Sequence, residues 1–362
     1  MAPLTLLGEP AVGADVSLES IGASLILDRT QITVSGISSG AYMAQQFHVA
    51  HSSHVAGAGL IAGGPYACAT GSYPPYSWLD VTGLYAATSR CSDTNPWWFY
   101  DGPPDLEASL EATRREAHAG GVDDPAGLRE DRVWLLSGGE DDTVPRDVVD
   151  VLAGYYLAFV PAEQLRYEKL DGAGHAMITE DFGNACGVSR TPFISDCDFD
   201  AAGALLAHLL GRLHPRASEA SPRSLKTFSQ EGFFDPDDDS VSLNRWGHVY
   251  VPAACQGGGT CRVHVAFHGC QQYQELVGDA FYARAGYNEW AESNAIVVLY
   301  PQTTSWSGSW FGDVGNPKGC WDWWGYSGNR FHRKDGKQMA AVAAMINALL
   351  GEAVLQTGGG PR

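Results

Sequence analysis

The sequence is poor in positive charge and lacks both long apolar runs and the cysteine spacing of metal sites. Its 362 residues include 23 lysines and arginines against 42 aspartates and glutamates, which gives a formal net charge of −19. Such a chain lacks the basic surface that nucleic acid or an anionic membrane attracts, so we expect neither as a partner. No apolar run approaches the roughly 20 residues that span a bilayer, and no C-x-x-C pair typical of a zinc site occurs. With 44% hydrophobic and 18% charged residues, a coiled coil and a disordered acidic chain are excluded as well.

The N-terminus and the cysteines bear on the compartment. The first residues have neither the basic n-region nor the full apolar h-region of an intact signal peptide. This leaves a cytoplasmic protein, or an exported one whose signal peptide has been removed. The eight cysteines can pair with their neighbours in sequence as 68–91, 186–197, 255–261 and 270–320, although eight cysteines allow 105 pairings. Buried free thiols are the alternative, but we favour several disulfides and therefore an extracellular or periplasmic location.

Short β-branched runs alternate with helical patterns, which predicts an α/β fold. In the first part, strands are expected at 31–35, 56–63, 132–137 and 164–169, and helices at 41–50, 106–119, 146–160 and 201–213. Residues 66–104 are expected to form an aromatic loop. Residues 216–240 are rich in Ser, Pro and Asp and are expected to be a solvated connector, because their acidic run lacks the glycine of a calcium loop. After it, strands are expected at 247–252, 261–267 and 295–300, and helices at 282–293 and 338–350.

A serine lies at the centre of a sharp strand-to-helix turn. The stretch Gly36-Ile-Ser-Ser-Gly40 follows the first strand and precedes the first helix, which is the setting of a G-x-S-x-G nucleophile elbow. Ser38 is therefore the candidate nucleophile. The backbone N–H of Ser39 follows the nucleophile and can point into an oxyanion hole. A plain Gly/Ser turn is the alternative.

An acid and a histidine follow in the order that a serine hydrolase of this type uses. A serine needs a general base, and the base needs a carboxylate that orients it. Asp141 lies on the loop after strand 132–137, with Glu140 and Asp142 as rivals, and His175 lies on a Gly-rich loop after strand 164–169. The order serine, acid, histidine is that of the α/β hydrolases. A solvated acidic turn and an ordinary surface or core histidine are the alternatives.

The second oxyanion donor normally comes from a loop whose strand precedes the elbow strand, but no such strand is evident before residue 31. The candidate lies downstream, where a His-Gly-Cys turn ending at Cys270 follows strand 261–267. The simplest inference is a circularly permuted α/β-hydrolase fold, with a mostly parallel central sheet flanked by helices. The Cys270 N–H then completes the hole, and a bridge to Cys320 would hold the loop firm. We expect His264 and His268 to be packing residues of this strand and turn.

Tryptophans gather on loops, above all between residues 304 and 326. Exposed tryptophans beside a catalytic serine would bind an apolar polymer, and Trp306 and Trp310 are the candidates for substrate binding. Trp321, Trp323 and Trp324 are expected to be largely core.

Four stretches together resemble the poly(3-hydroxybutyrate) depolymerase family in its single-domain, circularly permuted form. They are Gly36-Ile-Ser-Ser-Gly-Ala-Tyr-Met-Ala44, Val263-His-Val-Ala-Phe-His-Gly-Cys-Gln-Gln272, Val298-Leu-Tyr-Pro-Gln302 and Asn316-Pro-Lys-Gly-Cys-Trp-Asp-Trp-Trp-Gly-Tyr326. The resemblance covers about residues 28–350. It implies a serine carboxyl-ester hydrolase that cuts short-chain polyhydroxyalkanoates to 3-hydroxybutyrate monomers and oligomers. Motif matching places the nucleophile, acid, base and second oxyanion donor on Ser38, Asp141, His175 and Cys270, and a substrate-binding tryptophan on Trp306 or Trp310.

These expectations describe one catalytic domain over 1–362. Its nucleophile-acid-base part is 28–215, the connector 216–240 and the permuted part 241–350. We expect no separate substrate-binding domain, no metal or other cofactor, and a monomer that itself binds a hydrophobic polyester surface or 3-hydroxybutyrate oligomers. Two alternatives stay open: a feruloyl- or acetylxylan-type carbohydrate esterase, which shares the His-Gly-Cys turn, and a noncatalytic protein that binds polymer granules.

Overall fold

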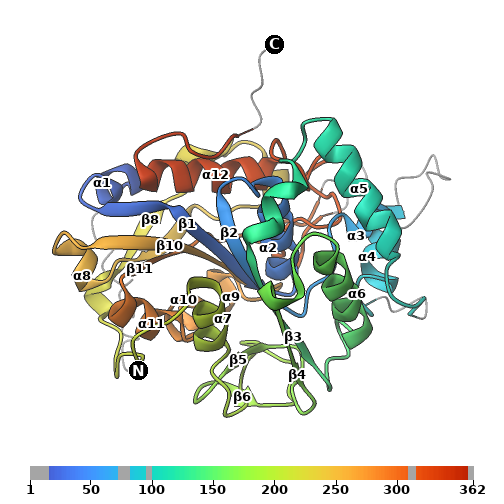
Figure 1. The fold of residues 1–362 in the computed structure, drawn as a ribbon, viewed down its shortest axis with the longest axis horizontal. Helices are drawn as coiled ribbons and strands as arrows, with labels where there is room; N and C mark the ends of the chain where they lie inside the picture. The colour runs from blue at the N-terminus through green and yellow to red at the C-terminus, as the bar shows by residue number, and fades with distance from the viewer. Residues whose placement is uncertain (1–15, 72–81, 95–99, 309–314, 358–362) are drawn as a thin grey trace, which may run out of the picture.

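The computed structural model describes residues 16–71, 82–94, 100–308 and 315–357. An eight-stranded, mostly parallel sheet runs through the molecule, with helices on both faces (Figure 1). The strand order across the sheet is β4-β3-β2-β1-β10-β11-β9-β8. The strands are β1 (Ile26–Ile37), β2 (Val55–Ile61), β3 (Arg132–Gly138), β4 (Leu165–Leu170), β8 (Leu225–Ser229), β9 (Trp246–Tyr250), β10 (Thr260–Phe267) and β11 (Ile296–Tyr300).

The centre of this sheet joins the two halves of the chain. Strand β1 pairs in parallel with β2 on one side and with β10 on the other. Strands β2, β3 and β4 continue in parallel, as do β10 and β11, whereas β9 and β8 are antiparallel additions. Both faces of the central strands are covered, and the second half of β1 is buried throughout. This is the environment in which near-continuous β-branched runs form parallel strands.

The connectivity confirms the circular permutation. The sheet has the strand order of an α/β hydrolase when the chain is followed from β8 to β11 and then from β1 to β4. Helix α12 (Lys337–Leu350) follows β11, and its end packs on α1 (Leu18–Gly22), which leads into β1. The contact is close, because a Cβ on Gly22 would lie 2.0 Å from the Leu349 carbonyl oxygen. The helix that would precede the elbow strand in an unpermuted chain is therefore the last helix here.

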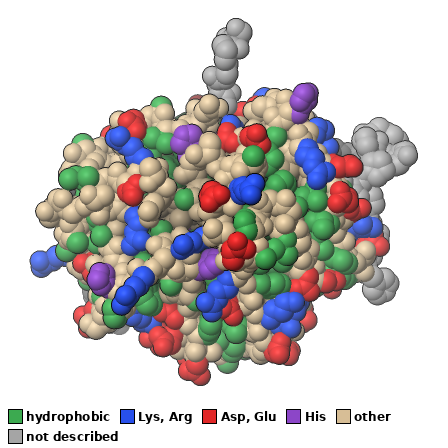
Figure 2. All heavy atoms as spheres, in the orientation of Figure 1, with side chains coloured by type: hydrophobic (Ala, Val, Ile, Leu, Met, Phe, Trp, Pro, Cys, Tyr) green, Lys and Arg blue, Asp and Glu red, His purple; other side chains and the backbone are tan. Residues whose placement is uncertain are grey.

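Helices α7 and α11 pack together on one face of the sheet, where Trp290 lies against Gly203, and α2 and α12 lie on the other face (Figure 1). The larger helices besides α12 are α2 (Ser39–Ala50), α5 (Leu106–His118), α6 (Arg146–Leu157), α7 (Ala201–Leu210) and α11 (Tyr287–Asn294). Shorter helices are α3 (Cys68–Gly71), α4 (Thr82–Ser89), α8 (Ala253–Gln256), α9 (Gln274–Val277) and α10 (Ala280–Arg284). Short 3₁₀ helices occur at Pro125–Glu130, Ala162–Gln164, Pro222–Ser224, Glu231–Phe233 and Asp239–Val241. On the face shown in Figure 2, acidic, basic and hydrophobic side chains are interspersed.

Several sequence expectations need correction. The connector at 216–240 is not merely solvated loop, because it contributes the edge strand β8. The helix expected at 282–293 is two helices, α10 and α11, separated at Gly286 with φ of +89°. The aromatic loop at 66–104 contains α3 and α4. A small sheet of β5 (Met177–Thr179), β7 (Ile194–Asp196) and β6 (Asn184–Ala185) was not predicted.

All eight cysteines form disulfides, and the pairing of sequence neighbours is confirmed. The bridges are Cys68–Cys91, Cys186–Cys197, Cys255–Cys261 and Cys270–Cys320. Four disulfides are typical of proteins that mature in an oxidising compartment. Within the described ranges, no helix combines the length and the apolar character that crossing a bilayer requires.

Candidate active site

Ser38 occupies the sharp turn between β1 and α2 and has φ 56° and ψ −124°. A non-glycine residue in this region carries strain of about 1–3 kcal/mol, which is typical of functional sites. Gly36 and Gly40 make the turn possible. A Cβ on Gly36 would lie 2.2 Å from the Gly40 carbonyl oxygen, and one on Gly40 would lie 2.3 Å from the Phe267 carbonyl oxygen. The Ser38 N–H donates to the Ile61 carbonyl at 2.9 Å, which fixes the turn to the end of β2.

His175 and Asp141 form a buried pair beside this turn. The His175 Nδ1 lies 2.8 Å from one Asp141 carboxylate oxygen, and the side chains are 8% and 1% exposed. The other carboxylate oxygen accepts the N–H groups of Thr143 and Val144 at 2.9 and 2.8 Å. Because a carboxylate only accepts, the Nδ1–H donates, and the neutral ring leaves Nε2 as an acceptor.

The structure also separates Asp141 from its rivals. Glu140 and Asp142 are exposed, whereas Asp141 is buried against His175. The two loops are joined by a hydrogen bond from the Glu140 N–H to the Ala173 carbonyl at 2.9 Å. The His175 N–H donates to Ser189 Oγ at 2.7 Å, so the histidine is held from its other side as well. The carboxylate and the imidazole therefore lie on two loops at the ends of the neighbouring strands β3 and β4.

The loop after β10 lies directly against Ser38. A Cβ built on Gly269 would be 3.3 Å from Ser38 Cβ. The next residue, Cys270, makes no hydrogen bond through its N–H to any described residue. Ser39 is the first residue of α2, and the first amide groups of a helix have no intrahelical acceptor. Two backbone N–H groups, one on each side of Ser38, are thus available to an oxyanion.

His268 braces this loop as a neutral residue. Its Nε2 accepts the Thr303 N–H at 3.2 Å, so the ring proton must be on Nδ1, which donates to the Gly269 carbonyl at 2.7 Å. Burial lowers the pKa of His268 to about 4, which keeps the ring in this state at neutral pH. The expected packing role of this histidine is therefore a specific one, since the ring fixes the backbone beside Cys270.

Two further links hold the same loop. The Gln272 side chain accepts the Gly269 N–H at 2.6 Å and donates to the Phe193 carbonyl at 2.8 Å. The Gln271 N–H donates to the Lys318 carbonyl at 2.7 Å. Together with the Cys270–Cys320 bridge, these contacts attach the loop to segments 80 residues earlier and 50 residues later in the chain.

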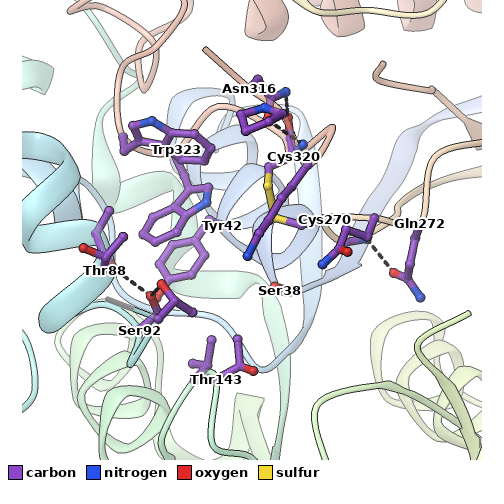
Figure 3. A pocket seen from close by; sticks show the side chains of 18 of the residues that line it. Ser38, Tyr42, Thr88, Ser92, Thr143, Cys270, Gln272, Asn316, Cys320 and Trp323 are labelled. Atoms are coloured by element: carbon purple, nitrogen blue, oxygen red, sulfur yellow. Dashed lines mark hydrogen bonds between the residues drawn. A yellow bond between two sulfur atoms is a disulfide. The ribbon is translucent and has the colours of Figure 1, made fainter. Parts of the chain in front are cut away.

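A cavity of about 520 Å³ opens over Ser38 and His175. Its aromatic wall is built by Tyr42 and Trp323, whose rings stack at 4.2 Å between centroids and 14° between planes, and by Trp324 at the edge of Trp323. Figure 3 shows the stacked pair, with Thr88 and Ser92, on one side of Ser38 and Cys270 with Gln272 on the other. Such a lining of apolar rings with a few hydroxyl and amide groups suits a small organic ligand.

The tryptophans are distributed differently from expectation. Trp321 is fully buried against Phe267, as expected of a core residue. Trp323 is also buried, at 8% exposure, as expected of a largely core residue, but it lines the cavity together with the less buried Trp324. Trp306 is not among the described residues that line it, and its backbone pairs with Asn316 in an isolated bridge. Trp310 lies outside the described residues.

Sequence reasoning missed Tyr42 and the residue that orients the tryptophans. Tyr42 lies one helical turn after Ser38 on α2, and that spacing was an available signal. Asp322 is a buried carboxylate that accepts the N–H groups of Gly325 at 2.7 Å and Ser327 at 2.8 Å, and of Trp324 and Tyr326 at 3.2 Å. The loop carrying Trp323 thus folds around a side chain that lies within the quoted stretch Asn316–Tyr326 but for which the sequence predicted no role.

The site has an elbow serine, a carboxylate-bound histidine and two backbone N–H groups with no acceptor among the described residues, all at the same end of this sheet. These features define the class of the protein as an α/β hydrolase of the serine type. No protein-family model matches the chain. It is 40% identical to the poly(3-hydroxybutyrate) depolymerase of Delftia acidovorans over 352 aligned residues. The alignment covers 96% of this chain and 64% of that protein. It is 32% identical over 331 residues to the polyhydroxybutyrate depolymerase of Talaromyces funiculosus, covering 88% and 89% of the two chains.

Solved structures agree with these relatives. The crystal structure of the PHB depolymerase from Penicillium funiculosum superimposes with a TM-score of 0.78 at 30% identity, covering 90% of this chain and 98% of that one. A serine-to-alanine variant of a PHB depolymerase complexed with an R3HB trimer superimposes with a TM-score of 0.77 at 30% identity. The chain therefore belongs to the poly(3-hydroxybutyrate) depolymerase family. It spans 64% of the length of the Delftia relative and 89% of that of the Talaromyces relative.

Proposed function

We propose that the protein hydrolyses the ester bonds of poly(3-hydroxybutyrate) or of its oligomers through an acyl-enzyme on Ser38. The observation that carries the proposal is the placement of Ser38 and His175 in one aromatic-walled cavity, in a fold shared with a depolymerase complexed with an R3HB trimer. Ser38 and His175 form no hydrogen bond with each other among the described residues. Such bonds often tighten only when substrate is bound.

The chemistry follows from the positions of the side chains. His175, oriented by Asp141, takes the proton of the Ser38 hydroxyl while Ser38 Oγ attacks the ester carbonyl. The Ser39 and Cys270 N–H groups bind the resulting oxyanion, and each such donor is worth about 10²–10³ in rate. The tetrahedral intermediate collapses as His175 gives its proton to the departing 3-hydroxyl oxygen. A water molecule, deprotonated by the same histidine, then attacks the acyl-enzyme. The hydroxyacyl group leaves as a carboxylic acid while His175 returns the proton to Ser38 Oγ.

We also propose that the described parts of 28–215 and 241–350 act as one catalytic domain, supported by the single sheet to which both contribute. The four disulfides favour an extracellular or periplasmic location. The roles of Trp306 and Trp310 and the monomeric state stay predictions.

The test is clearing of a poly(3-hydroxybutyrate) suspension and cleavage of the R-3-hydroxybutyrate trimer, with products identified by mass, for wild type and Ser38→Ala. Ser218→Ala, at an exposed serine, is the matched control. Release of 3-hydroxybutyrate or short oligomers by wild type and by the control, but not by Ser38→Ala, supports the proposal. Hydrolysis of feruloyl or acetyl esters but not of the trimer would instead identify a carbohydrate esterase, and granule binding without products would identify a binding protein.

A further inference from the structure

Lys318 stands out among the residues of the cavity. It is the only lysine, arginine, aspartate or glutamate among the described residues that line it. Lys318 is exposed and forms no ion pair with a described residue, whereas Lys169, Lys334 and Lys337 each pair with an aspartate. Lys318, which has no ion-pair partner among the described residues, therefore adds a positive charge to a described lining that is otherwise aromatic, aliphatic, amide, hydroxyl and imidazole in character.

The backbone at Lys318 is fixed to the oxyanion loop. The Lys318 carbonyl accepts the Gln271 N–H at 2.7 Å. Two residues later, Cys320 is joined to Cys270 by a disulfide. Asn316 closes the same segment, since its side chain accepts the Cys320 N–H and donates to the Cys320 carbonyl, both at 2.8 Å. The flexible lysine stem thus starts from a rigid point next to the amide group proposed to bind the oxyanion.

The chemistry of the substrate says what this cation can recognise. A linear 3-hydroxybutyrate oligomer has a free hydroxyl at one end and a free carboxylate at the other, and the carboxylate is ionised at neutral pH. When an ester bond of the oligomer is cut, the acyl half, which carries the hydroxyl end, stays on the serine. The carboxylate end is always part of the departing alcohol. The interior of the polymer offers no charge at all.

The charge of the whole protein favours a local cation where such a ligand binds. The formal net charge of −19 repels an anionic oligomer. A lysine at the cavity reverses that repulsion where the carboxylate arrives. Figure 3 shows Thr88 and Ser92 beside Tyr42 and Trp323, on the side of Ser38 opposite to Cys270, and their hydroxyl groups suit the uncharged hydroxyl end of the chain.

We infer that Lys318 binds the free carboxylate of a 3-hydroxybutyrate oligomer on the leaving-group side of the scissile ester, so that the enzyme prefers oligomers that present an acid end. The inference rests on the proposed function. It sets the direction of the bound chain: the hydroxyl end lies toward Thr88 and Ser92, and the acid end lies toward Lys318. It also predicts that the short acids released from the polymer are better substrates than their neutral analogues.

The experiment compares two substrates, the R-3-hydroxybutyrate trimer and the same trimer with its terminal carboxylate replaced by a carboxamide. The measured quantity is the ratio of their kcat/KM values in wild type, Lys318→Met and Lys318→Arg. Lys226→Met is the matched control, because Lys226 lies on edge strand β8 and does not line the cavity. Product masses identify the bond that is cut in each case.

Wild type is expected to prefer the acid by about three- to tenfold, the range of a partly exposed charge-assisted contact. Lys318→Met should bring the ratio to about one by raising KM for the acid alone, while Lys318→Arg and Lys226→Met should keep the preference. High salt should weaken it in wild type. An unchanged ratio in Lys318→Met, or an equal loss on both substrates, would overturn the inference and leave the proposed function intact. Hydrolysis of neither trimer by wild type would overturn both.

Discussion

Replacing Asp141 by asparagine tests the site by exchanging one atom at nearly constant volume. One carboxylate oxygen accepts the Thr143 and Val144 N–H groups, and the other accepts the His175 Nδ1–H. In Asp141→Asn the amide oxygen must stay on the two backbone groups, because an NH₂ turned toward them would leave buried donors facing donors. The new NH₂ group therefore faces His175 and donates a hydrogen bond to its Nδ1.

This single hydrogen bond places the imidazole proton on the wrong nitrogen. A neutral ring that accepts at Nδ1 carries its proton on Nε2 and cannot take the proton of the Ser38 hydroxyl. Loss of about 10⁴ in kcat is expected, the effect that the same exchange has in a serine protease triad. Both bonds from Thr143 and Val144 remain, so the free energy of unfolding should fall by only about 1 kcal/mol.

The assay is the initial rate of trimer hydrolysis, with thermal unfolding of the same samples. Glu140→Gln and Asp142→Asn are the controls, since both neighbours are exposed and should keep wild-type rates. A nearly unchanged rate in Asp141→Asn would refute the reasoning. So would an equally large loss in Asp142→Asn.

Three further outcomes are expected. Replacing Cys270 and Cys320 together by serine should lower kcat on the trimer about tenfold, because the loop that carries one oxyanion donor loses its covalent anchor, while a KM effect alone would contradict this. Trp323→Ala should raise KM for the trimer about tenfold through loss of its stacked wall and leave kcat on short esters nearly unchanged, as measured by steady-state kinetics. On acidification from about pH 6.5 to 4, the free energy of unfolding should fall, because burial holds the pKa of His268 at about 4 and the unfolded chain takes up the proton first. This one histidine contributes a slope of up to about 1.4 kcal/mol per pH unit. Unfolding free energies measured by denaturant titration across this pH range should depend less steeply on pH in His268→Gln than in wild type. An unchanged pH dependence would contradict the assignment.

The elbow was predictable from sequence because its cause is local. Gly36 and Gly40 flank the serine within five residues, and a β-branched run and a helical pattern flank the glycines. The approach of Asp141 to His175 was predictable from topology, since loops at the carboxyl ends of neighbouring parallel strands meet at one edge of a sheet. Which of three consecutive acids faces the histidine was indicated by the family resemblance, which placed the acid on Asp141, whereas the local residues left Glu140 and Asp142 as rivals. Inside a turn that choice depends on which carboxylate receives the following backbone N–H groups.

The circular permutation was predictable because the sequence shows no strand before residue 31, where an unpermuted α/β hydrolase has the strands that precede the elbow strand. Strand β8 was missed for a physical reason. It lies at the sheet edge and, among the described strands, pairs with β9 alone. It therefore needs few apolar residues, and Phe228 is its one buried residue. The break between α10 and α11 was missed because the helical pattern continues across Gly286, whose φ of +89° ends one helix and starts another.

In the aromatic wall of the cavity, the hydrophobicity of a tryptophan does not predict where its side chain lies. Trp321 and Trp323 are two residues apart and both buried, yet the first packs against Phe267 and the second stacks on Tyr42 in the cavity wall. What separates them is Asp322, whose carboxylate gathers the four backbone N–H groups that follow it. A buried charge that accepts several backbone donors fixes a loop more sharply than apolar burial, which has no direction. The position of Trp323 in the cavity wall is therefore set by a carboxylate that does not itself line the cavity. Recognising such a loop in a sequence requires following the backbone N–H donors as closely as the side chains.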